Sequence, residues 1–517
     1  MMKQRFVLLF LFLMGVMGNA QKMPVSYDFG EKFNDRYRYS NLLTIADDGE
    51  DGYVLVRAYF QGLILKPKGY LIERYDRNLQ LVSEYNYKLK GLDFVDGFLK
   101  NGQLNLLFLN YNYDRGQYEY SVHTSPIHEF NFREKKLLSI SSEQVQNPVG
   151  KNYYNRNFSK GFSTAILFNQ EKTGFIISTH HKKGKSNKHI IHLYDTALNK
   201  KFEHDFSYEI EEKNYAFENI AISSDLQTAY IIGKAYFKKK RFRVDERKFQ
   251  YELIKVSQNG SQTQSFDDPG KYSEGLYPII LSDRLVCTGF YADRKDNRYN
   301  GIAYFDVNPI SLNINSKKYN PFSQQFMEDK FGRDEEKEIK NLVFKGVEIT
   351  PEEEIFFNAE EYFVTNSMEV TGAGQRIRIE RFHHNDIVSA KLNTNGDLAW
   401  ARNINKAEVT QGDGAYASYS SYSRNGKTYF FICTSSENPQ LINNERIIFK
   451  QGLSRNRNVF IISLDEDGKM DYEKIIDNQE ARLPLMVSKP LKNIAENNML
   501  FYAKRGSKKQ LVKVAFN

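Results

Sequence analysis

The chain repeats a pattern of short apolar runs separated by polar linkers, and this pattern returns about eight times along its length. Each run is compact and turns small or polar near its end. Continuous apolar runs of four to eight residues are typical of strands that are buried on both faces. The runs begin at Tyr53, Leu104, Gly174, Ala229, Leu285, Ile355, Tyr429 and Met499.

A partner strand follows each of these runs, and several partners alternate apolar and polar residues as half-exposed strands do. The partners begin at Tyr70, Ser125, His189, Glu252, Gly301, Asp386, Val459 and Gln510. Three are followed by hairpin turns, at Asn259-Gly260, Asn395-Gly396 and Asp467-Gly468. A further strand follows the partner, as at residues 79–85, 398–404 and 472–476. A mean spacing of about 60 residues with no helical pattern between strands predicts an all-β fold built from four-stranded units.

The two ends of the chain predict a closed ring. The last unit shows only three strands, at residues 483–487, 499–503 and 511–516, while residues 25–29 form an unassigned strand near the beginning. We expect that N-terminal strand to complete the last unit, because closure removes sheet edges that would otherwise pair with other chains. This organisation resembles the β-propeller superfold, although no WD dipeptide series, kelch motif or Asp-box identifies a family. The prediction is a single closed propeller of eight four-stranded blades, with seven as the alternative count.

The first twenty residues predict export. Lys3 and Arg5 precede an apolar stretch at residues 6–16, and Gly18-Asn19-Ala20 provides the small residues of a cleavage site. We therefore assign residues 1–20 to a signal peptide, cleaved after Ala20, and residues 21–517 to the propeller domain. A retained membrane anchor is the alternative. No later segment approaches the roughly 20 apolar residues of a membrane-spanning helix, so the predicted address is the periplasm or the cell exterior.

Basic residues concentrate in the loops that would join the second and third strands of each blade. The whole chain is nearly balanced, with 72 Lys and Arg against 64 Asp and Glu, so the excess is local. In a propeller these loops share one face, and a face of one charge sign attracts anionic partners. The residues we predict to bind such a partner are Lys182, Lys183, Lys185, Lys238, Lys239, Lys240, Arg241, Arg243, Arg294, Arg298, Arg455 and Arg457. Solvated loops that maintain solubility are the alternative interpretation.

The loops at residues 362–384 and 435–458 are much longer than their counterparts in the other blades. Long loops in a compact fold are often functional. The alternative is that they are elongated hairpins that pack on a neighbouring blade or hold an oligomer together.

The sequence gives only weak signals for metal-binding or catalytic residues. The pairs His180-His181 and His383-His384 place adjacent side chains on opposite faces of a strand, so we expect surface or loop histidines and no metal site. The carboxylate clusters at residues 352–354 and 360–361 are expected to be solvated turns. No nucleophile elbow, phosphate loop or dinucleotide fingerprint occurs. We expect no catalytic residues and no cofactor, and we expect Cys287 and Cys433 to lie in different sheets as buried thiols.

These observations favour a non-catalytic binding or scaffold protein that holds an anionic glycan, an envelope polymer or an acidic protein, and not nucleic acid. Two alternatives stay open. One is a propeller enzyme acting on polysaccharide, which would need facing carboxylates at the central funnel. The other is a structural subunit of an envelope or secretion assembly, for which an apolar rim on the long loops would be the mark.

Overall fold

The structure of the protein is a computed structural model. It describes residues 23–517 except 51, 63–65, 89–90, 147–161, 185, 211–213, 237–248, 267, 294–297, 333–338, 371, 373, 412–413, 436–437, 443–445, 452–457, 482 and 494. The predicted signal peptide therefore lies outside the described residues.

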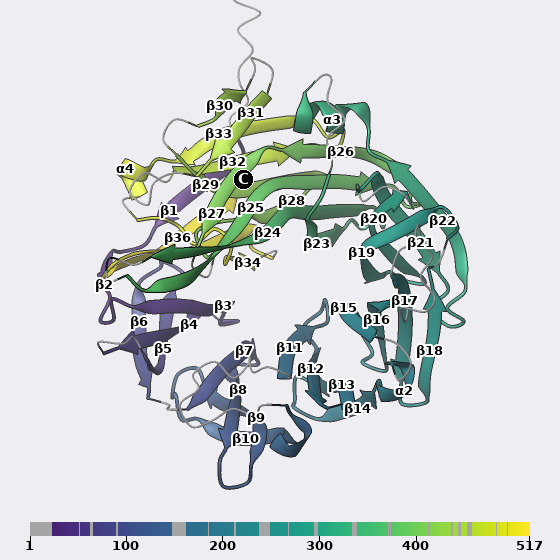
Figure 1. Ribbon diagram of the computed structural model, residues 1–517. Helices are drawn as coiled ribbons and strands as arrows, with labels where there is room; N and C mark the ends of the chain where they lie inside the picture. The colour runs from purple at the N-terminus through teal and green to yellow at the C-terminus, as the bar shows by residue number, and fades with distance from the viewer. Residues whose placement is uncertain are drawn as a thin grey trace, which may run out of the picture.

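Four-stranded antiparallel sheets follow one another around a central space, with β3, β7, β11, β15 and β19 nearest the centre (Figure 1). The first blade contains β3 (Ser40–Asp47), β4 (Gly52–Gln61), β5 (Lys66–Asp76) and β6 (Leu81–Tyr87). The second contains β7 (Leu92–Lys100), β8 (Gln103–Asn112), β9 (Gln117–Pro126) and β10 (Arg133–Ser141). The third contains β11 (Phe162–Phe168), β12 (Gly174–Lys183), β13 (Ser186–Asp195) and β14 (Lys200–Asp205).

The next four blades continue the series in chain order. The fourth contains β15 (Asn214–Ile222), β16 (Thr228–Tyr236), β17 (Phe249–Ser257) and β18 (Gly260–Ser265). The fifth contains β19 (Lys271–Ile280), β20 (Leu285–Asp293), β21 (Gly301–Val307) and β22 (Ile314–Pro321). The sixth contains β23 (Leu342–Ile349), β24 (Ile355–Val370), β25 (Arg376–Leu392) and β26 (Leu398–Ile404). The seventh contains β28 (Ser420–Arg424), β29 (Lys427–Thr434), β32 (Asn458–Leu464) and β33 (Met470–Ile476).

The last sheet is built from both ends of the chain. Its strand order is β1 (Val25–Phe29), β36 (Lys508–Phe516), β35 (Asn498–Arg505) and β34 (Leu491–Asn493), and β2 (Phe33–Asn34) also pairs with β36. The register of β1 on β36 runs from Val25 opposite Phe516 to Phe29 opposite Val512. The fold is thus a β-propeller in which seven four-stranded blades each come from one continuous stretch of chain, and the eighth sheet joins the two termini.

One strand of the closing sheet differs from the sequence prediction. Residues 483–487 form no strand; Leu485 makes only an isolated bridge with Ala503, and the inner strand is β34 instead. Their burial explains the false signal, because Leu483, Leu485 and Val487 pack into the core between the seventh blade and the closing sheet.

The hydrophobic core is divided among the junctions between neighbouring sheets. Leu42, Tyr53 and Leu55 of the first blade pack against Leu500 and Tyr502 of the closing sheet, and the same arrangement recurs at every other junction. Because each apolar strand is covered on both sides by neighbouring sheets, the continuous apolar runs in the sequence are explained. The packing of sheet on sheet thus continues all the way around the ring.

The two cysteines lie in separate cores, as predicted. Cys287 packs between the fourth and fifth blades, and Cys433 between the seventh blade and the closing sheet. Both are buried and neither forms a disulfide. Burial raises the pKa of the Cys287 thiol. Both side chains therefore act as small apolar groups.

The two long loops are elongated hairpins that extend the sixth blade. β24 and β25 pair from Ile355–Leu392 out to Val370–Arg376, well beyond the other blades. The second long loop folds into β30 (Gln440–Ile442) and β31 (Arg446–Lys450), and β31 pairs with β27 (Lys406–Thr410), which pairs with β25. This hairpin of the seventh blade thus packs on the sixth, which is the alternative that the sequence left open.

The helices of the described residues are short and lie between blades: η1 (Ser142–Gln144), α2 (Ser207–Ile210), α3 (Gln324–Phe331) and α4 (Asn478–Ala481). Ser323 caps α3 by accepting a hydrogen bond from the Phe326 N–H at 3.2 Å. In the described residues, no helix is both long and apolar enough to span a membrane.

Candidate functional site

Most of the predicted basic face lies outside the described residues. This applies to Lys185, Lys238, Lys239, Lys240, Arg241, Arg243, Arg294, Arg455 and Arg457. Lys182 and Lys183 end β12 and are exposed, whereas Arg298 is half-buried beside β21 on the fifth blade. These described residues lie at the β12–β13 and β20–β21 connections of two different blades, and their binding role stays a prediction.

A different basic and aromatic segment precedes the first blade. Residues 35–40 read Asp-Arg-Tyr-Arg-Tyr-Ser, and in the structure Asp35 and Tyr37 are buried while Arg36 and Arg38 are exposed. This alternation follows from the inward hydrogen bonds of the segment. The Tyr37 N–H donates to Asp35 Oδ1 at 3.1 Å, and the Tyr37 ring stacks on Tyr59 with centroids 3.9 Å apart. The outward arginines are therefore presented by a fixed backbone.

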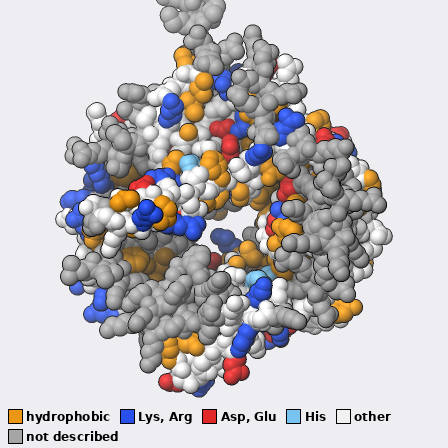
Figure 2. Space-filling model, in the orientation of Figure 1, with side chains coloured by type: hydrophobic (Ala, Val, Ile, Leu, Met, Phe, Trp, Pro, Cys, Tyr) orange, Lys and Arg blue, Asp and Glu red, His pale blue; other side chains and the backbone are white. Residues whose placement is uncertain are grey.

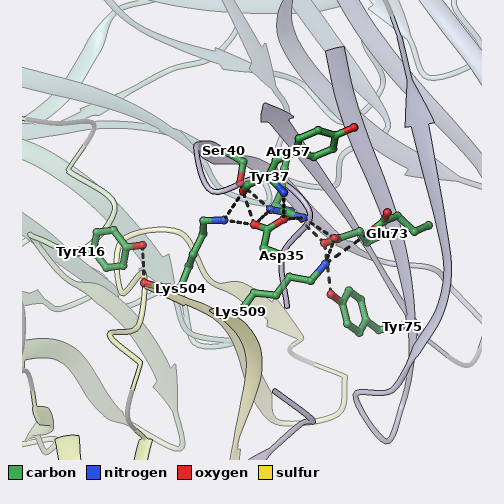
Figure 3. Close-up of polar contacts among 10 residues, drawn as sticks. Asp35, Tyr37, Ser40, Arg57, Glu73, Tyr75, Tyr416, Lys504 and Lys509 are labelled. Atoms are coloured by element: carbon green, nitrogen blue, oxygen red, sulfur yellow. Dashed lines mark hydrogen bonds and ion pairs between the residues drawn. The ribbon is translucent and has the colours of Figure 1, made fainter. Parts of the chain in front are cut away.

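A buried ion network holds this segment in place (Figure 3). Arg57 Nη1 donates to Asp35 Oδ2 at 2.6 Å, and Arg57 Nη2 donates to Glu73 Oε1 at 2.6 Å. From the closing sheet, Lys504 pairs with Asp35 and Lys509 pairs with Glu73. The side chains of Asp35, Arg57 and Glu73 are fully buried. The network ties the first blade to both ends of the chain.

The centre of the network contains more cations than carboxylates. Burial by itself would raise the pKa of Asp35, but hydrogen bonds and charge from Arg57 and Lys504 outweigh it and lower the pKa to about 2. Burial lowers the pKa of Lys504, and Asp35 opposes that shift. Lys509 is also buried, and it pairs with Glu73.

Above the network lies a pocket of about 560 Å³, which we call the junction pocket. It is lined by Arg38, Tyr39, Ser40, Asn41, Phe60, Tyr416, Met486, Lys504 and Gly506. These residues come from the start of β3, the end of β4, the β35–β36 turn, and the segments before β28 and β34. Phe60 and Gly506 lie at connections between second and third strands, so the pocket opens on the face that the sequence marked as the binding face.

The junction pocket combines cationic and aromatic groups, and none of its described lining residues is acidic. Arg38 lies over the Tyr39 ring with its guanidinium carbon 5.6 Å from the centroid, and Tyr39 is 49% exposed. On the part of the chain described, Arg38 has no ion-pair partner. The Tyr416 hydroxyl donates to the Lys504 carbonyl at 3.1 Å, which fixes the far wall. Figure 2 gives a general view of one face of the ring, on which Lys and Arg side chains (blue) and hydrophobic ones (orange) lie beside the central opening.

The pocket can bind an anion and a flat apolar surface at the same time. A guanidinium offers paired N–H donors that match a carboxylate. Exposed aromatic rings offer an apolar face, and Ser40 and Asn41 add hydroxyl and amide groups at the edge. Lys504 contributes positive charge from below, although two of its N–H groups already donate hydrogen bonds to Asp35 and to the Tyr37 carbonyl.

A second buried network in the sixth blade corrects two expectations. Glu360 was expected in a solvated turn and His384 on the surface, but Glu360 is fully buried and His384 is 8% exposed. Glu360 Oε2 is 3.2 Å from His384 Nδ1, and Glu360 Oε1 accepts from Lys406 Nζ at 3.2 Å. Lys406 also donates to Glu408 at 2.9 Å. Ordinary alternation along β24 places Glu360 on the same face as Phe356 and Asn358, which are also buried.

The pKa values in this network follow from burial and pairing. Burial alone would raise the pKa of Glu360, but the His384 hydrogen bond and the charges of Lys406 and Lys345 lower it to about 2. Burial raises the pKa of Glu408 despite its pairing with Lys406. The network joins the sixth blade to β27 and to Ser418, whose hydroxyl donates to Glu360 at 2.9 Å.

Among the remaining histidines, His181 was also expected on the surface and is buried. Neither of its ring nitrogens has a hydrogen-bond partner within the described structure, and burial lowers its pKa to about 4. His189 accepts or donates a hydrogen bond with Ser178 at 2.8 Å, and burial lowers its pKa to about 3. Within the described residues, no group of three or more His, Cys, Asp or Glu could hold a metal ion.

Carboxylates do face each other at the inner strands, but an ammonium group lies between them. Lys234 Nζ is 3.0 Å from Glu218 on β15 and 3.3 Å from Glu274 on β19. The Tyr251 hydroxyl donates to Glu218 at 2.6 Å. Burial would lower the pKa of Lys234, but the two carboxylates raise it. These ion pairs connect the fourth blade to the fifth, and both carboxylates take part in them.

The sequence reasoning missed the junction pocket because it considered only one class of loop. Arg38 and Tyr39 precede the first strand of a blade, and Tyr416 and Met486 precede others. The signal that could have found them is the alternation of arginine and tyrosine at residues 36–39, which no other part of the chain repeats. Lys504 carries no such signal, because its apolar neighbours indicate only a strand.

Comparison with known proteins adds no family. No protein-family model and no curated protein matches the chain. Among solved structures, the β-propeller domain of a trilobed protease from Pyrococcus furiosus is 7% identical, with a TM-score of 0.36 over 86% of this chain and 98% of that chain. A polysaccharide lyase is 9% identical, with a TM-score of 0.35 over 92% of this chain and 89% of that chain.

A third solved structure, a prolyl endopeptidase, is 9% identical, with a TM-score of 0.35 over 83% of this chain. This chain spans about half, 46%, of that protein's length. The arrangement of the sheets itself confirms the predicted resemblance to propellers. At such low identities and TM-scores these likenesses carry no argument about activity.

Proposed function

We propose that the protein is a non-catalytic binding protein that holds an anionic glycan in the junction pocket. The observation that supports this most directly is the pairing of Arg38, which has no described ion-pair partner, with the half-exposed ring of Tyr39 in a pocket whose described lining lacks acidic residues. A sugar acid presents both features in one ring, a carboxylate and a flat apolar face. Its hydroxyls would meet Ser40 and Asn41.

A fixed pocket also favours binding, because less side-chain freedom is lost when the ligand arrives. Asp35, Tyr37 and Ser40 are held by the buried network, and Tyr416 is held by its bond to Lys504. Export, as predicted from the leader at residues 1–20, would bring the protein to polymers of this kind outside the cytoplasm. An acidic protein surface shares the charge of a glycan, and a comparison of the two as ligands distinguishes them.

The test is a calorimetric titration of the purified protein with an oligomer of galacturonic acid, with a neutral glucose oligomer as the uncharged comparison. We expect the acidic oligomer alone to bind. Arg38→Gln should weaken binding about tenfold or more, since a charge-assisted hydrogen bond contributes about 1.5–3 kcal/mol. Arg36→Gln is the matched control, because Arg36 is also exposed over a neighbouring tyrosine ring but does not line the pocket.

Equal weakening by both substitutions would show that only overall charge matters and would contradict the proposed site. If neither oligomer binds but an acidic peptide does, with the same dependence on Arg38, the pocket would be an acidic-protein site and the glycan assignment would be wrong.

A second candidate function, a subunit of a larger assembly, is favoured by the distal part of the β24–β25 hairpin. Val364, Met368 and Val370 share one face of β24 and are 42%, 64% and 67% exposed. Arg376 and Arg378 lie opposite Val370 and Met368 on the same face. An exposed apolar strip flanked by arginines fits a protein partner with an acidic, apolar surface.

Replacing Met368 and Val370 with serine tests this candidate. Both side chains are exposed, so the free energy of unfolding should change by less than about 0.5 kcal/mol. The mass of the complex recovered with the protein from its native source, measured by light scattering, should fall to that of the single chain. An unchanged mass would exclude the hairpin as the contact surface.

A further inference from the structure

A separate cavity of about 500 Å³ lies on the outer rim of the ring between the sixth and seventh blades. Its walls are α3, the outer strand β26, the strand β31 and the start of β33. We call it the rim pocket. Its lining and that of the junction pocket have no residue in common, so a ligand of the rim pocket is independent of the proposed function.

The walls of the rim pocket are locked together. Arg402 of β26 donates to both carboxylate oxygens of Asp329 in α3, at 2.5 and 3.0 Å. Asn405 Nδ2 then donates to the Asp329 carbonyl at 2.8 Å and to the Ile447 carbonyl of β31 at 3.3 Å. A cavity with fixed walls is the usual form of a small-molecule site.

A guanidinium group forms one side of the rim pocket. Arg446 donates from Nη1 to the Lys330 carbonyl, and within the described chain it has no carboxylate partner. It lies against Gly332, where an added Cβ would come within 3.5 Å of Arg446 Nε. Gly332 also ends α3 with a φ of 80°, a backbone conformation that favours glycine.

Asn403 also lines the rim pocket, and its side chain carries an unpaired acceptor. Asn403 is fully buried, and its Nδ2 donates to Asp386 and to Asn405, each at 3.1 Å. Its Oδ1 has no hydrogen-bond partner in the described structure. A buried acceptor without a donor is costly, so a ligand that supplies an N–H is favoured here. The half-buried carboxylate of Glu328 lies in the same lining and receives a hydrogen bond from Gln324 at 2.8 Å.

Apolar side chains complete the lining. Ile404 and Phe449 are buried, and Ile447 and Met470 are partly buried beside them. The rim pocket thus provides a guanidinium cation, a carboxylate acceptor, an amide acceptor and an apolar wall.

We propose that the rim pocket binds a small zwitterion with an apolar body, of the class of the apolar α-amino acids. The carboxylate pairs with Arg446, the ammonium group donates to Asn403 Oδ1 and Glu328, and the side chain packs on Phe449 and Met470. One ligand that carries both charges and an apolar body matches the guanidinium, the carboxylate and the apolar wall of this cavity.

The test is calorimetric titration of the full chain with L-leucine, N-acetyl-L-leucine and L-leucinamide. Leucine is expected to bind at least about tenfold more tightly than either derivative, because each derivative removes one charged partner. Failure of leucine, methionine and phenylalanine to bind at concentrations up to about 10 mM, or equal affinity of leucine and its derivatives, would overturn the proposal.

A substitution locates the site. Arg446→Gln should weaken leucine binding about tenfold or more. Arg424→Gln is the matched control, since Arg424 also donates to a backbone carbonyl, that of Phe516 at 2.9 Å, but lies on β28 outside the cavity. Unchanged leucine affinity in Arg446→Gln, with the fold confirmed by circular dichroism, would overturn the assignment to this pocket.

Discussion

Arg57 shows at the residue scale how this propeller uses charge in its interior. Its guanidinium is fully buried and is shared between Asp35 and Glu73, with Tyr502 beneath it at 5.6 Å. Taking such charges out of water is costly, and the cost is offset only when each has a partner. The same rule explains Glu360, Lys406 and Glu408 in the sixth blade. In both networks the buried charged residues lie where separate elements meet.

Removing one partner should therefore destabilise the protein strongly. We expect Arg57→Ala to lower the free energy of unfolding by about 3–5 kcal/mol, because Asp35 and Glu73 lose their shared partner. Chemical denaturation monitored by circular dichroism measures the change. The control is Arg378→Ala, an exposed pair with Glu380 at 3.6 Å, which should cost about 0.5 kcal/mol or less. Similar losses in both variants would show that the buried network contributes little.

Stability should also depend on pH through the buried histidines. Burial lowers the pKa of His181 from 6.5 to about 4 and that of His189 to about 3. The unfolded chain takes up these protons near pH 6.5, before the folded chain does, so acid favours unfolding. The contribution is complete above pH 6.5 and decreases as the pH falls toward 4.

The thermal midpoint measured from pH 7.5 down to about 4 should fall, and His181→Gln should make this fall shallower, because glutamine does not titrate. At still lower pH, loss of the depressed carboxylates Asp35 and Glu360, each with a pKa of about 2, should add to the effect. A variant with the same pH profile as the original chain would contradict the role assigned to His181.

At the scale of elements, β1 is the strand on which ring closure depends. It lies at the edge of the closing sheet and pairs with β36, the last strand of the chain. Val25, Tyr27 and Phe29 pack against the core between that sheet and the seventh blade. The Tyr27 hydroxyl also donates to Glu480 of α4 at 2.9 Å. β1 thus covers an edge and a core at once.

A chain that begins at Gly30 should be less stable than one that begins at Met23. The loss of three half-buried side chains, at about 1 kcal/mol each, predicts a decrease of about 3 kcal/mol or more in the free energy of unfolding. The uncovered edge of β36 should also promote association that increases with concentration. Thermal unfolding and light scattering measure the two effects, and two chains of equal stability would show that β1 does not close the ring.

The sequence predicts the elements well where apolar pattern decides them. The second strands of the blades, most of the third strands, the strand at residues 25–29 and the separate burial of the cysteines follow from it. The predicted third strand of the second blade was wrong: it is β9 at Gln117–Pro126, and the strand predicted from Ser125 is mostly a turn. The pattern fails where burial does not imply a strand, as at Leu485, and where a charged residue is buried with charged partners, as at Glu360. The junction pocket could not be predicted, because its residues come from segments that only ring closure brings together.

For the whole molecule, the central consequence of the fold is that chain ends meet the first blade. Lys504 and Gly506 come from the closing sheet, and Phe60 comes from the first blade. Arg38 and Tyr416 come from the segments before the first and the seventh blade. A pocket assembled in this way exists only in the closed ring. Binding and closure are therefore linked, and destabilising the closing sheet should weaken binding in proportion to the fraction of open rings.

A crystal structure of the protein in complex with a galacturonic acid oligomer would test directly whether the junction pocket is the binding site. We predict a sugar carboxylate within hydrogen-bond distance of Arg38 and a sugar ring stacked on Tyr39, in the pocket above Lys504. A sugar bound at another place on the ring, with the junction pocket free of it, would contradict this assignment.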